Sequence, residues 1–247
     1  MMMRSGNPAL NQDIFLSERS FDSGDAMTIQ GTVNKTALTL FILTAAAMFV
    51  WNRAFTGQSV QGLMLGGAIG GFIVAMVTIF KKTAAPITTP IYGLLEGLFL
   101  GGLSAHMEVR YPGIVLNAVG LTLACLFALL AAYKSRLIPV TENFKLGMAA
   151  ATGGIMILYL VNMVMGFFGS RIGFIHESGP IGIAFSLFVV GLAAFNLVLD
   201  FDFIEQGAGA GAPKYMEWYG AFGLVVTLVW LYIEILRLLA KLQDRRR

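Results

Sequence analysis

Charge is scarce in this sequence. Of its 247 residues, 57% are hydrophobic and only 13% are charged, with 17 Lys and Arg against 14 Asp and Glu. Soluble domains carry roughly 45–50% apolar and about 25% charged residues. The composition therefore excludes a soluble globular domain and predicts a polytopic membrane protein. A net charge of +3 spread over loops makes no basic face, which also excludes a nucleic-acid-binding protein.

Cysteine, histidine and catalytic motifs are also scarce or missing. The single Cys125 excludes a disulfide framework and a CxxC metal site. The sequence has no H-E-x-x-H, G-x-S-x-G or G-x-G-D motif of the kind that an intramembrane protease needs. We expect neither an enzyme nor a cofactor. His106 and His176 fall in two connectors, where we expect solvated side chains and not metal ligands.

Long apolar runs dominate what is present. A helix needs about 20 mainly apolar residues to cross roughly 30 Å of hydrocarbon. Seven stretches meet this length: Gly31–Trp51, Gln61–Phe80, Pro90–His106, Pro112–Tyr133, Leu146–Gly169, Gly179–Phe203 and Tyr219–Ala240. The sequence thus predicts an all-α membrane protein with seven transmembrane helices joined by short, charged connectors.

The two ends of the chain differ from its centre. Residues 1–30 are polar and lack the apolar h-region of a cleaved signal peptide. We expect a polar cytoplasmic tail over residues 1–30, a transmembrane domain over 31–240 and a basic tail over 241–247. The Gly- and Ala-rich segment Gln206–Pro213 is not followed by G-K-[ST], so it predicts a flexible linker and not a phosphate-binding loop.

Basic residues are divided unequally between alternate connectors. The connectors on the N-terminal side of the membrane hold six, namely Lys81, Lys82, Lys134, Arg136, Lys145 and Lys214, and the opposite connectors hold three, Arg53, Arg110 and Arg171. Lys and Arg gather in short cytoplasmic loops. The N-terminus should therefore be cytoplasmic. The basic tail opposes this orientation, because seven crossings place it outside.

Glycines recur at four-residue intervals inside the expected spans. Gly62, Gly66 and Gly70 form one row, Gly67 and Gly71 a second, and Gly97 and Gly101 a third. Small residues with this spacing let helix backbones approach closely in lipid. The rows predict tight helix packing; a sliding or rocking motion between helices is the open alternative.

Few ionisable residues fall within the expected spans. An ionisable group in hydrocarbon is costly unless it is paired, protonated or next to water, so each one is a functional candidate. Glu96 lies early in the third span, and Asp200 and Asp202 close the sixth. Chain direction puts Glu96 and Asp200 in the same half of the membrane, where they could face one cavity. Asp200 and Asp202 lie about 200° apart around a helix, and the deeper Asp200 is expected to point inward.

Other polar residues have simpler explanations. Glu234 in the seventh span lies three residues before Arg237, a spacing that favours a local ion pair. Asn117, Asn162 and Asn196 carry no charge, and we expect them to form hydrogen bonds between helices. Asp202 and Glu205 lie near a helix end, where both can reach water.

Three features of the chain together resemble one known family. They are the seven spans with short loops, the Y-G-L-L-E-G-L-F-L-G run at Tyr92–Gly101, and a seventh span that ends in Ile235-Leu-Arg237. That family is the Bax inhibitor family, the transmembrane Bax-inhibitor-motif proteins that include the bacterial YccA-like membrane proteins. The resemblance covers roughly residues 31–240. It implies six helices around a central C-terminal helix, in a bacterial-type cytoplasmic (inner) membrane.

The resemblance also implies a pH-sensitive calcium leak closed by a latch of two aspartates, one from the sixth and one from the seventh helix. The first falls on Asp200; the second is expected ten residues before Arg237, where this chain has Thr227. Asp202, Glu217 or Glu96 could take its place. An arginine expected in the second helix is also missing. The candidate ion-pathway or proton-sensing residues are Asp200, Glu96 and Asp202, with Glu217, Glu234, Arg237 and Asn196 as secondary candidates.

The resemblance, together with these residues, implies two alternative functions. The first is a proton-regulated cation leak with calcium as the permeant ion and no resident metal; its oxygen ligands would be carboxylates, amides and helix-end carbonyls. The second is a non-conducting membrane protein that binds a membrane protein partner, such as a quality-control protease. The lipid bilayer is the expected surrounding in both cases.

Overall fold

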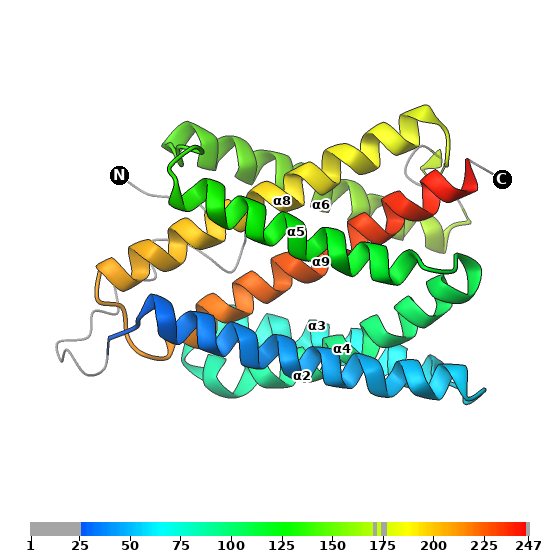
Figure 1. Cartoon of the computed structure of the whole chain (residues 1–247), viewed down its shortest axis with the longest axis horizontal. Coiled ribbons are helices and arrows are strands. Elements are labelled where there is room, and N and C mark those ends of the chain that lie inside the picture. The colour runs from blue at the N-terminus through cyan, green and yellow to red at the C-terminus, as the bar shows by residue number, and fades with distance from the viewer. Residues whose placement is uncertain (1–25, 170–171, 174–176, 246–247) are drawn as a thin grey trace. The chain divides into compact units, whose positions relative to one another are not determined.

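The computed structural model describes residues 26–169, 172–173 and 177–245. These residues form seven long α-helices and a short 3-10 helix, and they contain no β-strand (Figure 1). The helices are α2 (Ile29–Phe55), α3 (Gln61–Phe80), η1 (Lys82–Ala84), α4 (Ala85–Arg110), α5 (Ile114–Lys134), α6 (Glu142–Phe167), α8 (Pro180–Gly209) and α9 (Met216–Asp244). The predicted all-α fold is confirmed.

Six of these helices are long and apolar enough to cross a membrane; α4 is the exception within the described part of the chain. Its 26 residues span about 39 Å, so length is not what sets it apart. The protein is therefore a multi-pass membrane protein, and the predicted seven spans agree roughly with its helix count.

The C-terminal helix is the most enclosed of the six candidate spans. In its most apolar window 67% of the residues are buried, compared with 50% in α8 and 17–22% in α2, α3, α5 and α6. A helix buried on all sides must be apolar all round, whereas peripheral helices expose apolar side chains to lipid. The expectation of a central C-terminal helix agrees with this burial.

Several helix boundaries differ from the predicted ones. The third helix begins at Ala85 and not at Pro90, because Pro86 is accommodated in its first turn, where no backbone N–H is needed. α8 continues to Gly209, so half of the expected flexible linker is helical. The rest is a turn in which Gly211 has φ +69° and Met27 N donates a 2.7 Å hydrogen bond to the Ala212 carbonyl. α9 runs to Asp244, into the expected C-terminal tail.

The chain divides into two compact units. Among the described residues, the first unit comprises residues 113–201 and 227–245, and the second comprises residues 26–112 and 202–226. Each unit is described separately below. α8 and α9 each contribute one segment to both units.

The second unit is built on close contacts of glycine with backbone. In α4, Gly97 lies against the Leu43 carbonyl and Ala46 of α2, and Gly101 lies against the Ala47 backbone. In α3, Gly67 lies against the backbone of Leu95 and Phe99 in α4. α4 therefore packs on both α2 and α3.

Not every glycine of the predicted rows lies at an interface. The Gly97 and Gly101 row and the Gly67 and Gly71 row pack. In the remaining row, Gly70 lies against the Leu95 side chain, but Gly62 and Gly66 have no neighbouring heavy atom within 4 Å of an added Cβ. Spacing alone cannot tell a face that meets a helix from a face that meets lipid.

The first unit has an aliphatic core between α6 and the segments of α8 and α9 that belong to it. Met148, Ile155, Val189, Leu192 and Leu199 are its buried members. Trp230 of α9 and Phe144 of α6 pack against them. This core fixes the position of the polar groups that α6, α8 and α9 carry.

We expect Gly97→Ala to destabilise the protein. The added methyl group would meet the Leu43 carbonyl and Ala46, and overpacking of this kind costs about 1–3 kcal/mol. The midpoint of thermal unfolding in detergent should fall. Gly62→Ala is the matched control, because its methyl group meets nothing within 4 Å. Equal effects of the two substitutions would contradict the packing of α4 on α2.

Candidate functional site

Asp200 is fully buried in the apolar α8. Its exposed fraction is 0%, and its neighbours Leu199 and Phe201 are also buried. Asp202, two residues on, is half-buried, and its carboxylate accepts a 2.5 Å hydrogen bond from Gln206 Nε2. Glu205 is exposed. The inward position predicted for Asp200 thus agrees with its burial.

In the first unit, one contact between α8 and α9 relates the positions of Asp200 and Thr227 by residue count. Lys241 Nζ of α9 donates hydrogen bonds to the Gly182 carbonyl (2.9 Å) and to Ser186 Oγ (2.8 Å) of α8. Asp200 lies fourteen residues after Ser186, and Thr227 lies fourteen residues before Lys241. At about 1.5 Å per residue, both are about 21 Å from this anchor. By residue count, Thr227 in α9 and Asp200 in α8 are thus equally far from this contact along their own helices, and both are buried.

Glu234 belongs to a three-residue polar network in the first unit. Arg237 Nη1 lies 3.1 Å from the Glu234 carboxylate, as the sequence predicts from their spacing. Tyr159 of α6 connects the two: its hydroxyl donates a 3.0 Å hydrogen bond to Glu234 and accepts one of 2.7 Å from Arg237. Tyr159 was not predicted, because no local pattern links α6 to α9. The network neutralises Glu234 and makes it a structural group.

Two further polar side chains of the first unit join helices. Asn196 Nδ2 of α8 donates a 3.0 Å hydrogen bond to Thr152 Oγ1 of α6, as expected for an amide between helices. Lys241 is 4% exposed, although we expected it to begin a basic C-terminal tail. No signal in the sequence distinguishes it from the lysines and arginines of a basic tail.

Glu217 is a buried carboxylate with several charged and polar partners in the second unit. It lies in the first turn of α9, where a negative charge is favourable, and its exposed fraction is 0%. Lys35 of α2 and Lys214 both form ion pairs with its carboxylate, at 3.1 Å in the case of Lys214. The backbone N–H and the hydroxyl of Thr28 donate to Oε1 at 2.8 and 2.9 Å. An added Cβ at Gly31 would collide with this carboxylate.

Thr28 has two roles in this arrangement. Its hydroxyl accepts a 2.9 Å hydrogen bond from Gly31 N and so caps the N-terminus of α2. The same hydroxyl donates to Glu217, which fixes the start of α2 against the start of α9. Glu217 was predicted only as a secondary candidate, because its partner Lys35 lies 182 residues away in the chain and no local pattern links them.

Glu96 lies in α4 of the second unit and is half-buried. A Cβ added to Gly71 of α3 would lie 3.0 Å from Glu96 Oε2, so the carboxylate rests against the glycine face of α3. Tyr92, one turn earlier on α4, packs edge-on against Phe222 of α9 with 5.1 Å between ring centroids. Glu96 therefore lies at the interface of α3 and α4, where Gly71 leaves room for its carboxylate.

The predicted site residues divide between the two units. Asp200, Asn196, Glu234 and Arg237 belong to the first, whereas Glu96, Asp202 and Glu217 belong to the second. A cavity common to Glu96 and Asp200 stays a prediction. His106 is exposed, as expected, and His176 lies outside the described residues. The described residues hold no group of three or more His, Cys, Asp or Glu side chains that could bind a metal ion.

The fold and its acids define a polytopic helical membrane protein with buried ionisable groups in its helices. The chain belongs to the Bax inhibitor 1-like family, whose model matches residues 7–244. Comparison with curated proteins finds no match.

We expect Glu217→Gln to lower the free energy of unfolding by an amount on the order of 3 kcal/mol, because the mostly buried Lys35 would lose its counter-charge. Denaturation in detergent measures this loss. Lys214→Gln is the control: the Lys214 side chain is 50% exposed, so its ion pair should contribute at most about 1 kcal/mol. A loss for Glu217→Gln no larger than that of the control would show that Glu217 does not hold α2 against α9.

Proposed function

We propose that this protein is a proton-regulated cation leak with calcium as the permeant ion, and that it catalyses no reaction. The burial of Asp200 in a helix that can cross a membrane carries this proposal. A carboxylate at such a position costs about 3 kcal/mol or more when it is ionised, so a structure retains it for a function or for a specific contact. Membership of the Bax inhibitor 1-like family supports the same function.

The chemistry of the acids fits conduction better than storage of the ion. Calcium takes six to eight oxygen ligands in a tight protein site. Asp200 and Asp202 are two residues apart in α8, but only Asp200 is fully buried, and the described residues offer no cluster of three ligands. A single buried carboxylate attracts a cation without holding it firmly, as a leak requires.

Thr227 gives the proposed latch a particular form. A hydroxyl at the depth of Asp200 can donate a hydrogen bond to an ionised carboxylate and accept one from a protonated carboxyl group. The α8 and α9 segments of the first unit can thus stay joined in either protonation state of Asp200. Protonation of Asp200 then removes the negative charge that attracts the cation, but it leaves α8 and α9 in contact.

We further propose a bacterial-type cytoplasmic membrane as the location, with the N-terminus in the cytoplasm. The six basic residues of one set of connectors, against three in the other, support this orientation. An epitope placed before Met1 should be accessible to antibody in inside-out vesicles and protected in intact spheroplasts. The reverse pattern would refute the orientation.

Asp200→Asn should reduce calcium flux into proteoliposomes by tenfold or more, because it removes the charge that attracts the cation. Adding Glu96→Gln tests whether the second unit contributes to the same pathway. Glu205→Gln is the matched control, since it removes an exposed carboxylate from the same helix. Equal flux through the wild type and the Asp200→Asn, Glu96→Gln double variant at every pH would refute the leak and favour the non-conducting partner protein.

Thr227→Asp extends the same assay. It would place a second carboxyl group at the depth of Asp200, and two neighbouring carboxyl groups can share one proton. The calcium flux of this variant should depend more steeply on pH than that of the wild type. Thr227→Asn, which is similar in size and uncharged, should not change the steepness. Identical pH profiles for all three proteins would show that Thr227 does not act on Asp200.

A further inference from the structure

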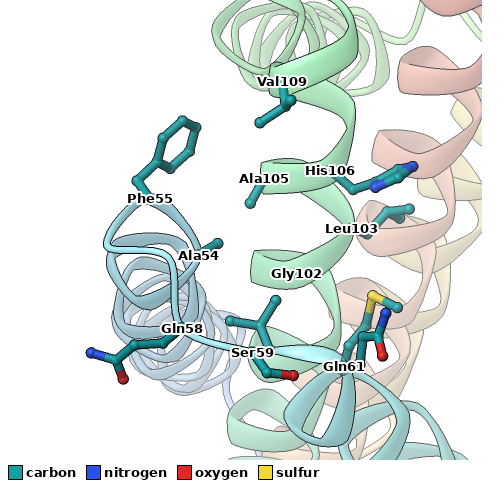
Figure 2. Close-up of a pocket in the computed structure, with 12 residues that line it drawn as sticks. Ala54, Phe55, Gln58, Ser59, Gln61, Gly102, Leu103, Ala105, His106 and Val109 are labelled. Atoms are coloured by element: carbon teal, nitrogen blue, oxygen red, sulfur yellow. The ribbon is translucent and has the colours of Figure 1, made fainter.

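A groove in the second unit has no part in the proposed leak. It lies between the last turn of α2, the connection at residues 56–60, the first turn of α3 and the C-terminal part of α4 (Figure 2). Its volume is about 560 Å³. Small-molecule sites commonly measure about 300–1,000 Å³. The groove is therefore large enough to hold a ligand.

Small side chains account for this open space. Gly101 is the last α4 glycine in backbone contact with α2, and α4 continues nine residues further, to Arg110. Over this last part, about 14 Å long, Gly102 and Ala105 project little from α4, and Ala54 projects little from α2. The α2–α3 connection turns away here without filling the space.

The lining of the groove is amphipathic and uncharged. Figure 2 places Ala54 and Phe55 on one side and Gln61 and His106 on the other. Ser59 adds a hydroxyl, and no Asp, Glu, Lys or Arg lines the groove. The amide N–H groups, the hydroxyl and an imidazole N–H can donate hydrogen bonds, so the groove suits an apolar body attached to uncharged oxygen acceptors.

The location of the groove indicates where such a molecule comes from. α2 ends and α3 begins beside it, and both helices are long and apolar enough to cross a membrane. Their junction therefore lies at a membrane surface, where ester and glycerol oxygens meet hydrocarbon. Phe55 and Val109 line the groove and are 53% and 73% exposed, so an apolar path leads from it to the lipid-facing side.

We propose that this groove binds a glycerophospholipid from the adjacent leaflet. An acyl chain lies along Phe55 and Val109, and the ester oxygens accept hydrogen bonds from Ser59, Gln61 and His106. The site requires neither conduction nor Asp200, so its test does not depend on the proposed leak.

Thiol labelling tests the proposal. Ser59→Cys in a Cys125→Ala background is purified in dodecyl maltoside, and its maleimide reaction is followed while dioleoyl phosphatidylglycerol is titrated in. We expect saturable slowing of the reaction by fivefold or more. Ser135→Cys is the matched control, because Ser135 is also an exposed serine in a connector, outside the second unit. Its reaction should not slow.

Two variants locate the protection in the groove. Ala54→Phe fills the space from a half-buried position, and His106→Leu removes a donor from an exposed position that tolerates substitution. Both should abolish most of the protection while the melting temperature stays within a few degrees of the wild type. If Ala54→Phe does not fold, His106→Leu alone decides. Equal slowing at Ser59→Cys and Ser135→Cys, absence of slowing, full protection by glycerol phosphate without acyl chains, or protection unchanged by His106→Leu would overturn the proposal.

Discussion

A charged side chain inside a bilayer must find a partner, and this requirement organises the polar groups of the protein. The buried Glu217 contacts two lysines and Thr28, the buried Glu234 contacts Arg237 and Tyr159, and the buried Lys241 contacts a carbonyl and a hydroxyl of α8. Breaking such a buried pair costs several kcal/mol, because a charge is left behind. A shift of one helix along another would leave these buried groups without partners, so the contacts hold the helices in register.

These contacts give the central helix two anchors. Near its start, within the second unit, Glu217 fixes α9 against α2. Near its end, within the first unit, Lys241 and Arg237 fix it against α8 and α6. The segment between them is almost wholly apolar, so its packing is not directional. Thr227 lies in this segment, away from the charged residues of both anchors.

Local patterns predict the helices and the contacts within one helix. The apolar runs place all seven helices, and the three-residue spacing of Glu234 and Arg237 predicts their ion pair. The partners of Glu217 and the burial of Lys241 arise from helix packing, and no nearby residue signals them. The same is true of the glycines: Gly62 and Gly97 look alike in sequence, and only the fold shows which one meets another helix.

A threonine in place of the second acid of the proposed latch would affect how such a leak opens. Two facing carboxylates repel once both are ionised, and that repulsion can separate helices. An aspartate paired with a threonine would have no such repulsion, and a hydroxyl–carboxylate hydrogen bond is strongest when the acid is ionised. Loss of a proton from Asp200 would then strengthen the junction between α8 and α9. In the proposed leak, opening would then need a competitor for the ionised Asp200, and a permeant cation has the charge to compete.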